Sequence, residues 1–227
     1  MAAYVNQVLF GYYPYIALSV FLLGSLIRFD RDQYSWRSGS SQLLRRRQLV
    51  WGSNLFHIGI LLLLGGHAVG LLTPHEVYAA IGLTAATKQM LAITVGGIAG
   101  TICFIGLTLL LARRLFDSRI RKTGSAMDTA ILLLLYAQLN LGLATLPVSL
   151  GHADGATMLV LAEWAQRIVT LRGGAADLLA DVHWIFKLHI VGGLTVFLLF
   201  PFSRLVHIWS APVWYLGRKG YQIVRQR

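Results

Sequence analysis

Long apolar runs are the feature that most constrains the fold of this 227-residue chain. Hydrophobic residues make up 56% of the sequence and charged residues only 13%, whereas a soluble domain would carry about 25% charged residues. The apolar residues gather in runs of about twenty, the length that an α-helix needs to cross about 30 Å of hydrocarbon. Because no hydrophilic stretch is long enough to bury its own core, the sequence predicts an all-α integral membrane protein with a single domain over residues 1–227.

Hydropathy predicts a bundle of five transmembrane helices. We expect these helices at about residues 8–27, 48–72, 89–112, 126–148 and 184–208. The first run lacks a basic leading region and a small-residue cleavage site, so we interpret it as a retained helix and not as a signal peptide. The longest loop, residues 149–183, contains an amphipathic stretch for which we expect a short helix lying on the membrane surface.

The distribution of basic residues predicts the orientation of the bundle. Of the 20 Lys and Arg residues, those in the first loop, the third loop and the C-terminal segment would lie on one side. The other side would carry only Lys88, Arg167, Arg172 and Lys187. Since basic residues collect on the cytoplasmic side, this asymmetry predicts a periplasmic N-terminus and a cytoplasmic C-terminus. The net charge of +11 is therefore an orientation signal, and it leaves a positive cytoplasmic face suited to an acidic partner or anionic lipid.

Four histidines lie inside two of the apolar runs: His57 and His67 in the second, and His189 and His207 in the fifth. An imidazole in hydrocarbon must be hydrogen-bonded or bound to a group that uses its lone pair. The two helices run in opposite directions. Depth therefore pairs His67 with His189 in the outer half and His57 with His207 toward the cytoplasm.

Helix geometry supports this pairing only in part. The 18 residues from His189 to His207 make about five turns and separate two imidazoles on one helix face by about 27 Å. Between His57 and His67 the rise is about 15 Å and the directions differ by roughly 80°. The unequal rises predict tilted helices or an offset at the cytoplasmic end.

A planar iron porphyrin, which needs two axial ligands, fits one histidine from each helix. Zinc prefers four ligands, and no cysteine or carboxylate lies at a matching depth. Glycines beside the histidines leave room for a flat cofactor, or else serve helix packing: Gly59, Gly65, Gly66, Gly192 and Gly193. The pattern predicts two bis-histidine haem b groups, held non-covalently because the sequence has no CxxCH motif. For any single histidine, an interhelical hydrogen bond is the alternative.

Six-coordinate haem iron would only carry electrons, so a donor and an acceptor are needed. The single cysteine, Cys103, excludes a four-thiolate iron–sulfur cluster in this chain, so the cytoplasmic acceptor must be another polypeptide. Lys88, at the outer end of the third run, could donate a hydrogen bond to a lipid-soluble quinol, although a snorkelling lysine is the plainer interpretation. Another alternative is a transporter that uses the histidines as a proton relay, which would need acidic residues at membrane depth. The second and fifth runs contain none, and Asp128, at the start of the fourth run, is the nearest candidate.

Several strings carry a resemblance to a known family: YPYIA, QYSWR, SNLFHIGI, GLLTPH and FLLFPFSRLVHIWSAPVWYL. The sequence resembles the gamma subunits of bacterial respiratory nitrate reductase, which are dihaem cytochrome b membrane anchors. The resemblance covers nearly the whole chain and is weakest in the amphipathic outer loop.

The resemblance implies a role for each site residue. Histidines that match His57 and His207 bind the haem nearer the cytoplasmic subunits, and those that match His67 and His189 bind the haem nearer the periplasm. The lysine that matches Lys88 belongs to the quinol site. The implied protein lies in the bacterial inner membrane and oxidises menaquinol or ubiquinol. Its implied partners are an iron–sulfur beta subunit and a molybdenum-containing alpha subunit that reduces nitrate. The alternative is a dihaem quinone-reactive anchor of another respiratory oxidoreductase.

Overall fold

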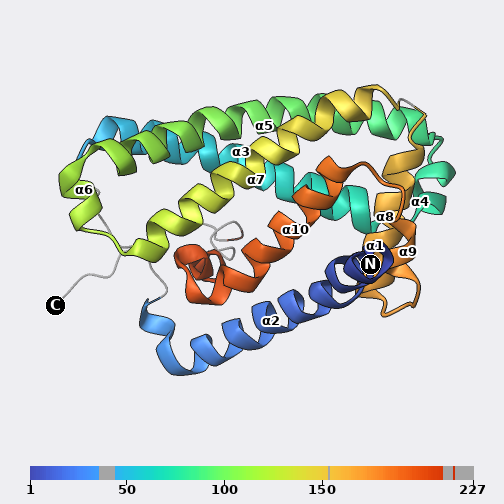
Figure 1. Cartoon of the computed structure of the whole chain (residues 1–227). Helices are drawn as coiled ribbons and strands as arrows, with labels where there is room; N and C mark the ends of the chain where they lie inside the picture. The colour runs from blue at the N-terminus through green and yellow to red at the C-terminus, as the bar shows by residue number, and fades with distance from the viewer. Residues whose placement is uncertain (36–43, 153, 212–216, 218–227) are drawn as a thin grey trace.

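The computed structural model of the chain describes residues 1–35, 44–152, 154–211 and 217, and nearly all of them are helical (Figure 1). Within this part of the chain, five segments are long and apolar enough to cross a membrane. They are Ala3–Asp32, Arg46–Leu72, Ala85–Phe116, Ala126–Leu150 and Trp184–Phe202. The predicted all-α class and the five spans are thus confirmed, with most helices a few residues longer than expected.

The elements follow one another along the chain as five long segments with short helices between them. The first segment comprises α1 (Ala2–Gln7), the π-helical turn η1 (Val8–Tyr12), α2 (Tyr13–Asp32) and the 3-10 turn η2 (Gln33–Ser35). The next three are α3 (Arg46–Leu72), α5 (Ala85–Phe116) and α7 (Ala126–Leu150), separated by α4 (His75–Ala80) and α6 (Ser118–Lys122). The rest comprises α8 (Ala156–Val169), α9 (Ala175–Leu178), α10 (Trp184–Leu199), η3 (Phe200–Phe202) and η4 (Arg204–Ser210).

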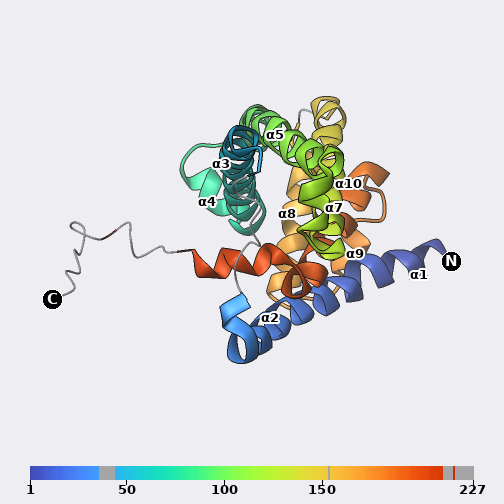
Figure 2. The same ribbon diagram turned by 90° about the vertical axis from the view of Figure 1, so that its left-hand side faces the viewer.

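The long helices pack in the order α3, α5, α7, α10 and α2 (Figures 1 and 2). Helices α3 and α5 approach each other closely through two glycines. A Cβ on Gly106 of α5 would collide with the backbone of Phe56, and one on Gly59 of α3 would lie 2.6 Å from the backbone nitrogen of Cys103. Cys103 is fully buried in this contact, which is the packing role of a small apolar side chain. Of the five spans, α3 is the least covered: 6% of its most apolar window is buried, against 33% for α5. Most of the α3 surface is therefore free to meet lipid or a bound group.

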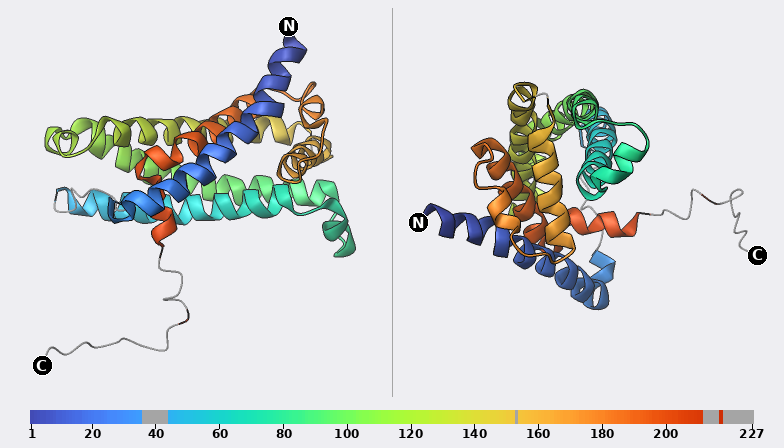
Figure 3. Two further views of the ribbon diagram at one scale, coloured as in Figure 1. Left: turned by 90° about the horizontal axis from the view of Figure 1, so that it is seen from below. Right: turned by 90° about the vertical axis from the view of Figure 1, so that its right-hand side faces the viewer.

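Short helices close one end of the bundle, where α4, α8 and α9 gather (Figure 3); we call this the α8 end and the opposite one the α6 end. The predicted amphipathic helix is present as α8, and its apolar side packs against Phe10 and α9. Pro14 has no N–H to offer the Phe10 carbonyl one helical turn before it. The buried indole nitrogen of Trp164 donates to that carbonyl instead, at 3.0 Å. This bond ties α8 to the first span.

The fifth span does not continue as one helix over 184–208, so that prediction is wrong. Helix α10 ends at Leu199 and gives way to the short 3-10 turn η3. Ser203 then adopts an extended conformation, with φ −117° and ψ 176°, before η4 begins. Figures 2 and 3 show η4 leaving the line of α10 and running toward the side where α3 lies. The Arg28 guanidinium of α2 donates to the carbonyl oxygens of Pro201 (2.7 Å) and Ser203 (3.0 Å), which lie at the break.

Candidate functional site

The structure brings the four intramembrane histidines together as two pairs. The ring centroids of His67 on α3 and His189 on α10 lie 6.1 Å apart, with an interplanar angle of 43°. Those of His57 on α3 and His207 on η4 lie 6.4 Å apart, at 73°. We call these the α8-side pair and the α6-side pair. They are the combinations that helix direction and depth predicted.

The break after α10 explains how His189 and His207, on consecutive segments of the chain, can both meet histidines of the single helix α3. Ten residues of α3 separate its two histidines by about 15 Å, whereas a continuous fifth helix would separate its own by about 27 Å. Because the chain turns aside at Ser203, His207 approaches His57 from η4 and not from a prolonged α10. The offset expected at the cytoplasmic end is therefore a change in chain direction, not a tilt.

Three of the four imidazoles are oriented by the backbone of their own helix. Their Nδ1 atoms contact carbonyl oxygens three or four residues earlier: His57 to Ser53 (2.7 Å), His67 to Leu63 (2.7 Å) and His207 to Arg204 (2.6 Å). A ring that donates Nδ1–H to a carbonyl keeps its lone pair on Nε2. This is the usual arrangement of a metal-ligating histidine. His189 differs, because its Nδ1 contacts the side-chain amide of Gln138 on α7 at 3.0 Å.

The spacing of each pair fits a single metal ion between two rings. A metal–nitrogen bond of about 2 Å on each side, with about 1 Å from each nitrogen to its ring centre, gives about 6 Å between centres. No group of three or more His, Cys, Asp or Glu side chains gathers anywhere in the described part of the chain. The donor set at each level is two imidazoles, which suits an iron whose other four ligands belong to a porphyrin.

The glycines near the histidines do not all serve one purpose. A Cβ on Gly65 or Gly66, beside His67, would meet nothing within 4 Å. Gly59 instead allows α3 to approach α5. A Cβ on Gly192 would collide with the amide oxygen of Gln138, so that glycine makes room for a side chain. Only Gly65 and Gly66 fit the expectation of space left for a flat group.

Lys88 lies at the α8 end of the bundle, in the first turn of α5, and does not snorkel. Its side chain is buried, with the residue 6% exposed. The ammonium nitrogen lies 3.7 Å from the centroid of the Tyr78 ring, whose hydroxyl donates to the Val69 carbonyl on α3. Within the described residues the Lys88 ammonium makes this cation–π contact and no hydrogen bond. An ammonium with three unused donors beside an aromatic ring is suited to an oxygen-bearing aromatic ligand.

Asp128, the acidic residue considered for a proton relay, is engaged in structural contacts at the α6 end. It forms a capping box with Ser125 at the start of α7. Its carboxylate also lies 3.1 Å from Arg114 and 3.7 Å from Arg204. The charge is thus neutralised between α5, α7 and η4, which helps to anchor the segment that carries His207.

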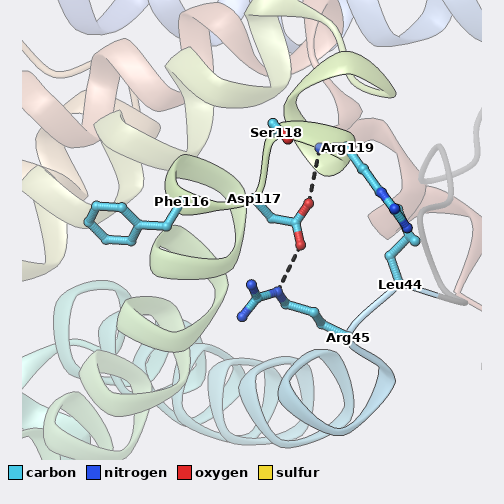
Figure 4. A pocket seen from close by; sticks show the side chains of 6 residues that line it. All are labelled: Leu44, Arg45, Phe116, Asp117, Ser118 and Arg119. Atoms are coloured by element: carbon cyan, nitrogen blue, oxygen red, sulfur yellow. Dashed lines mark hydrogen bonds and ion pairs between the residues drawn. The ribbon is translucent and has the colours of Figure 1, made fainter.

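A second polar group at this end involves Asp117, in a surface pocket between α3 and α6 (Figure 4). Its carboxylate accepts a hydrogen bond from Arg45 at 2.7 Å and another from the backbone N–H of Arg119 at 3.0 Å. The Arg45 bond is the main reason that the pKa of Asp117 lies below its usual value. None of the four histidines lines this pocket.

By their positions in the sequence, Arg37, Arg204 and Lys187 are candidates to pair with the propionates of a haem. The Arg204 guanidinium lies 3.7 Å from the Asp128 carboxylate. Lys187 donates to the Ala180 carbonyl at 2.7 Å, and Arg37 lies outside the described residues. Sequence reasoning missed Gln138, Tyr78 and Arg28. An isolated amide within the fourth apolar run was a signal that could have revealed Gln138, since a polar side chain at membrane depth needs a partner.

Comparison with known proteins decides the family. The family model described as nitrate reductase gamma subunit matches residues 6–227. The chain belongs to this family. It is 53% identical to the respiratory nitrate reductase 1 gamma chain of Escherichia coli strain K12, over 99% of both chains. It is 50% identical to the respiratory nitrate reductase 2 gamma chain of the same strain over the full length of both. To the nitrate reductase gamma chain of Bacillus subtilis strain 168 it is 41% identical, over 98% of this chain and 99% of the relative.

Proposed function

We propose that this chain is the membrane cytochrome b subunit of a respiratory nitrate reductase. In this role it oxidises quinol near the α8 end and passes electrons through two b-type haems to an iron–sulfur subunit. The observation that carries the proposal is that the four histidines face each other two by two. The ring centres are 6.1 Å apart in the α8-side pair and 6.4 Å apart in the α6-side pair. Family membership supplies the reaction that such a conduit would serve.

The four histidines would hold the two haems as axial ligands. His67 and His189 would hold one, and His57 and His207 the other. When bound, each haem supplies one-electron redox chemistry with no open position for substrate. The Nδ1 contacts of the four rings keep the imidazoles facing each other, so that little reorganisation of the chain accompanies electron transfer.

Quinol would bind at the α8 end, beside Lys88. The Lys88 ammonium would donate a hydrogen bond to a quinol oxygen, and Tyr78 would keep the ammonium in place through its ring face. The Tyr78 hydroxyl bond to Val69 links this position to the last turn of α3, two residues beyond His67 in sequence. This continuity supports electron transfer from the quinol to the α8-side pair.

The orientation follows from the basic residues. The α8 end would face the periplasm and the α6 end the cytoplasm, in the inner membrane of a bacterium. The basic α6 end would dock the iron–sulfur beta subunit, which would pass electrons to the molybdenum-containing alpha subunit. Residues 1–227 would form one domain with no catalytic site for nitrate.

The test separates electron entry from haem binding. In the assembled complex, Lys88→Met should lower quinol-dependent nitrate reduction at least tenfold, while both haems remain and a soluble donor that bypasses this subunit still drives nitrate reduction. Lys187→Met is the matched control: it removes a lysine on the same side that is already bonded to a backbone carbonyl. Equal activity of the Lys88 variant and the wild type would contradict the quinol assignment. A reduced-minus-oxidised spectrum without b-type haem would contradict the whole proposal.

A further inference from the structure

His189 differs from the other three histidines in what orients it. His57, His67 and His207 each contact a carbonyl of their own helix through Nδ1. The His189 Nδ1 contacts Gln138, which lies on a different helix, α7. The rotation of three rings is therefore fixed by local backbone geometry, and that of the fourth by a side chain that could be replaced.

Gln138 is attached to His189 at two points. The amide nitrogen lies 3.0 Å from the ring Nδ1 and 2.9 Å from the His189 backbone oxygen. The amide thus spans the ring and the main chain of the same residue. Two contacts of this kind restrict both the rotation of the imidazole and the position of α10 relative to α7.

Three glycines provide the space for this arrangement. A Cβ on Gly142, one turn beyond Gln138 on α7, would lie 3.0 Å from the His189 ring carbon Cε1. A Cβ on Gly193 would lie 3.3 Å from the Gln138 amide nitrogen, and one on Gly192 would collide with the amide oxygen. Any larger residue at these positions would displace the ring or the amide. The space that holds the His189 ring and the Gln138 amide is thus formed by glycines of both α7 and α10.

The Gln138 amide keeps hydrogen-bonding capacity that the protein does not use. Its oxygen is buried and has no partner. The two ends of an amide can exchange by rotation of the group, and a His ring nitrogen can donate or accept according to its tautomer. When Nε2 is engaged, Nδ1 carries the proton, and rotation of the Gln138 amide would turn its oxygen to accept from Nδ1–H in place of the bond to the His189 carbonyl.

We infer that Gln138 is a positioning residue that sets the orientation of the His189 imidazole. Through that imidazole it would affect the ferric spectrum and the midpoint potential of the α8-side haem, and not those of the other haem. This inference rests on the proposed function, because it requires a haem between His67 and His189. The interplanar angles of 43° and 73° already distinguish the two pairs. The angle between axial imidazoles affects the low-spin ferric spectrum, and hydrogen bonds to ligands tune redox potential.

The test uses the assembled complex and electron paramagnetic resonance with a redox titration of both haems. In Gln138→Leu we expect the ferric signal and midpoint potential of one haem to shift, and those of the other to stay unchanged. The shifted haem should be the one that His189→Leu removes. Asn140→Leu is the matched control, because it replaces an amide on the same helix that donates to its own backbone, at Tyr136; both haems should match the wild type.

Gln138→Glu covers the case in which the leucine variant fails to incorporate haem. A carboxylate of the same length can still accept from Nδ1–H, so this variant should restore the α8-side haem. Unchanged signals in Gln138→Leu, equal shifts of both haems, or loss of haem that glutamate does not restore would each overturn the inference. A wild-type protein with no b-type haem would instead overturn the proposed function, so the two failures are distinguishable.

Discussion

The α8-side and α6-side pairs reach nearly the same ring spacing by different means. His67 and His189 both lie on regular helices, and a glutamine from a third helix orients one of them. His207 lies on a short 3-10 segment beyond a break, where Arg28 and Asp128 hold the chain through charged hydrogen bonds and ion pairs. The α8-side pair thus depends on helix packing, and the α6-side pair on a polar network around a bend.

This difference shows what a straight helix cannot do. Two helices that run in opposite directions can align histidines at two depths only if the intervals match, and here they differ by eight residues. A break near Pro201 removes the mismatch, and the polar groups exposed by the break must then find partners. Arg28, which would otherwise be a basic residue at a helix end, provides two of them.

The largest expected effect comes from removing the support of the bend. Arg28→Met deletes two charged hydrogen bonds to buried carbonyls and should destabilise the bend by about 3 kcal/mol. We expect loss or spectral broadening of the α6-side haem, while the α8-side haem is retained. Arg31→Met, on the same helix and exposed, should leave both. Loss of both haems to the same extent in the Arg28 variant would contradict the division between the two regions.

A smaller effect is expected at the α8 end. Trp164→Phe keeps the aromatic packing but leaves the Phe10 carbonyl without a partner, which should lower the free energy of unfolding by about 1–3 kcal/mol. Thermal unfolding of the purified complex measures this, and both haems should remain at room temperature. Trp184→Phe, at an exposed position (63%), should change the stability by less than about 0.5 kcal/mol. If the two variants were equally stable, the indole bond would not anchor α8.

The comparison of the two pairs also shows which features the sequence could predict. Apolar run length predicts the five spans, and helix direction with depth predicts which histidines meet, because these depend on local composition and on one-dimensional position. The bend was not predicted, although Pro201 and the polar residues Ser203 and Arg204 interrupt the apolar run. Its position depends on a contact with Arg28, 173 residues away in sequence.

Contacts between side chains of different helices could not be predicted from the sequence either. Gln138 contacts His189 across 51 residues, and no local pattern specifies which face of α7 meets α10. The same holds for α8: its amphipathic pattern predicts a helix with one apolar face, but the pattern is identical whether lipid or protein covers that face. Tertiary packing decided in favour of protein.

The smallest expected effect concerns pH and the Arg45–Asp117 pair, which lies apart from both histidine pairs. The pKa of Asp117 is lowered in the folded chain, chiefly by the hydrogen bond from Arg45. The carboxylate therefore stabilises the fold above its unfolded pKa, and this contribution is lost as the pH falls through the lowered folded value. Asp117→Asn should lower the thermal midpoint slightly at neutral pH, with the difference vanishing in acid and both haem signals unchanged. A difference that grew in acid would contradict this sign.

The most direct measurement of the central claim is haem content and identity in single histidine variants. Assembled complexes carrying His67→Leu, His189→Leu, His57→Leu or His207→Leu should each retain one of two haems, resolved by pyridine haemochrome assay and by the ferric resonance signals. We predict that the first two variants lose one and the same signal, and that the last two lose the other. Retention of both haems in any of the four, or loss of the same signal from His67→Leu and His57→Leu, would contradict the pairing.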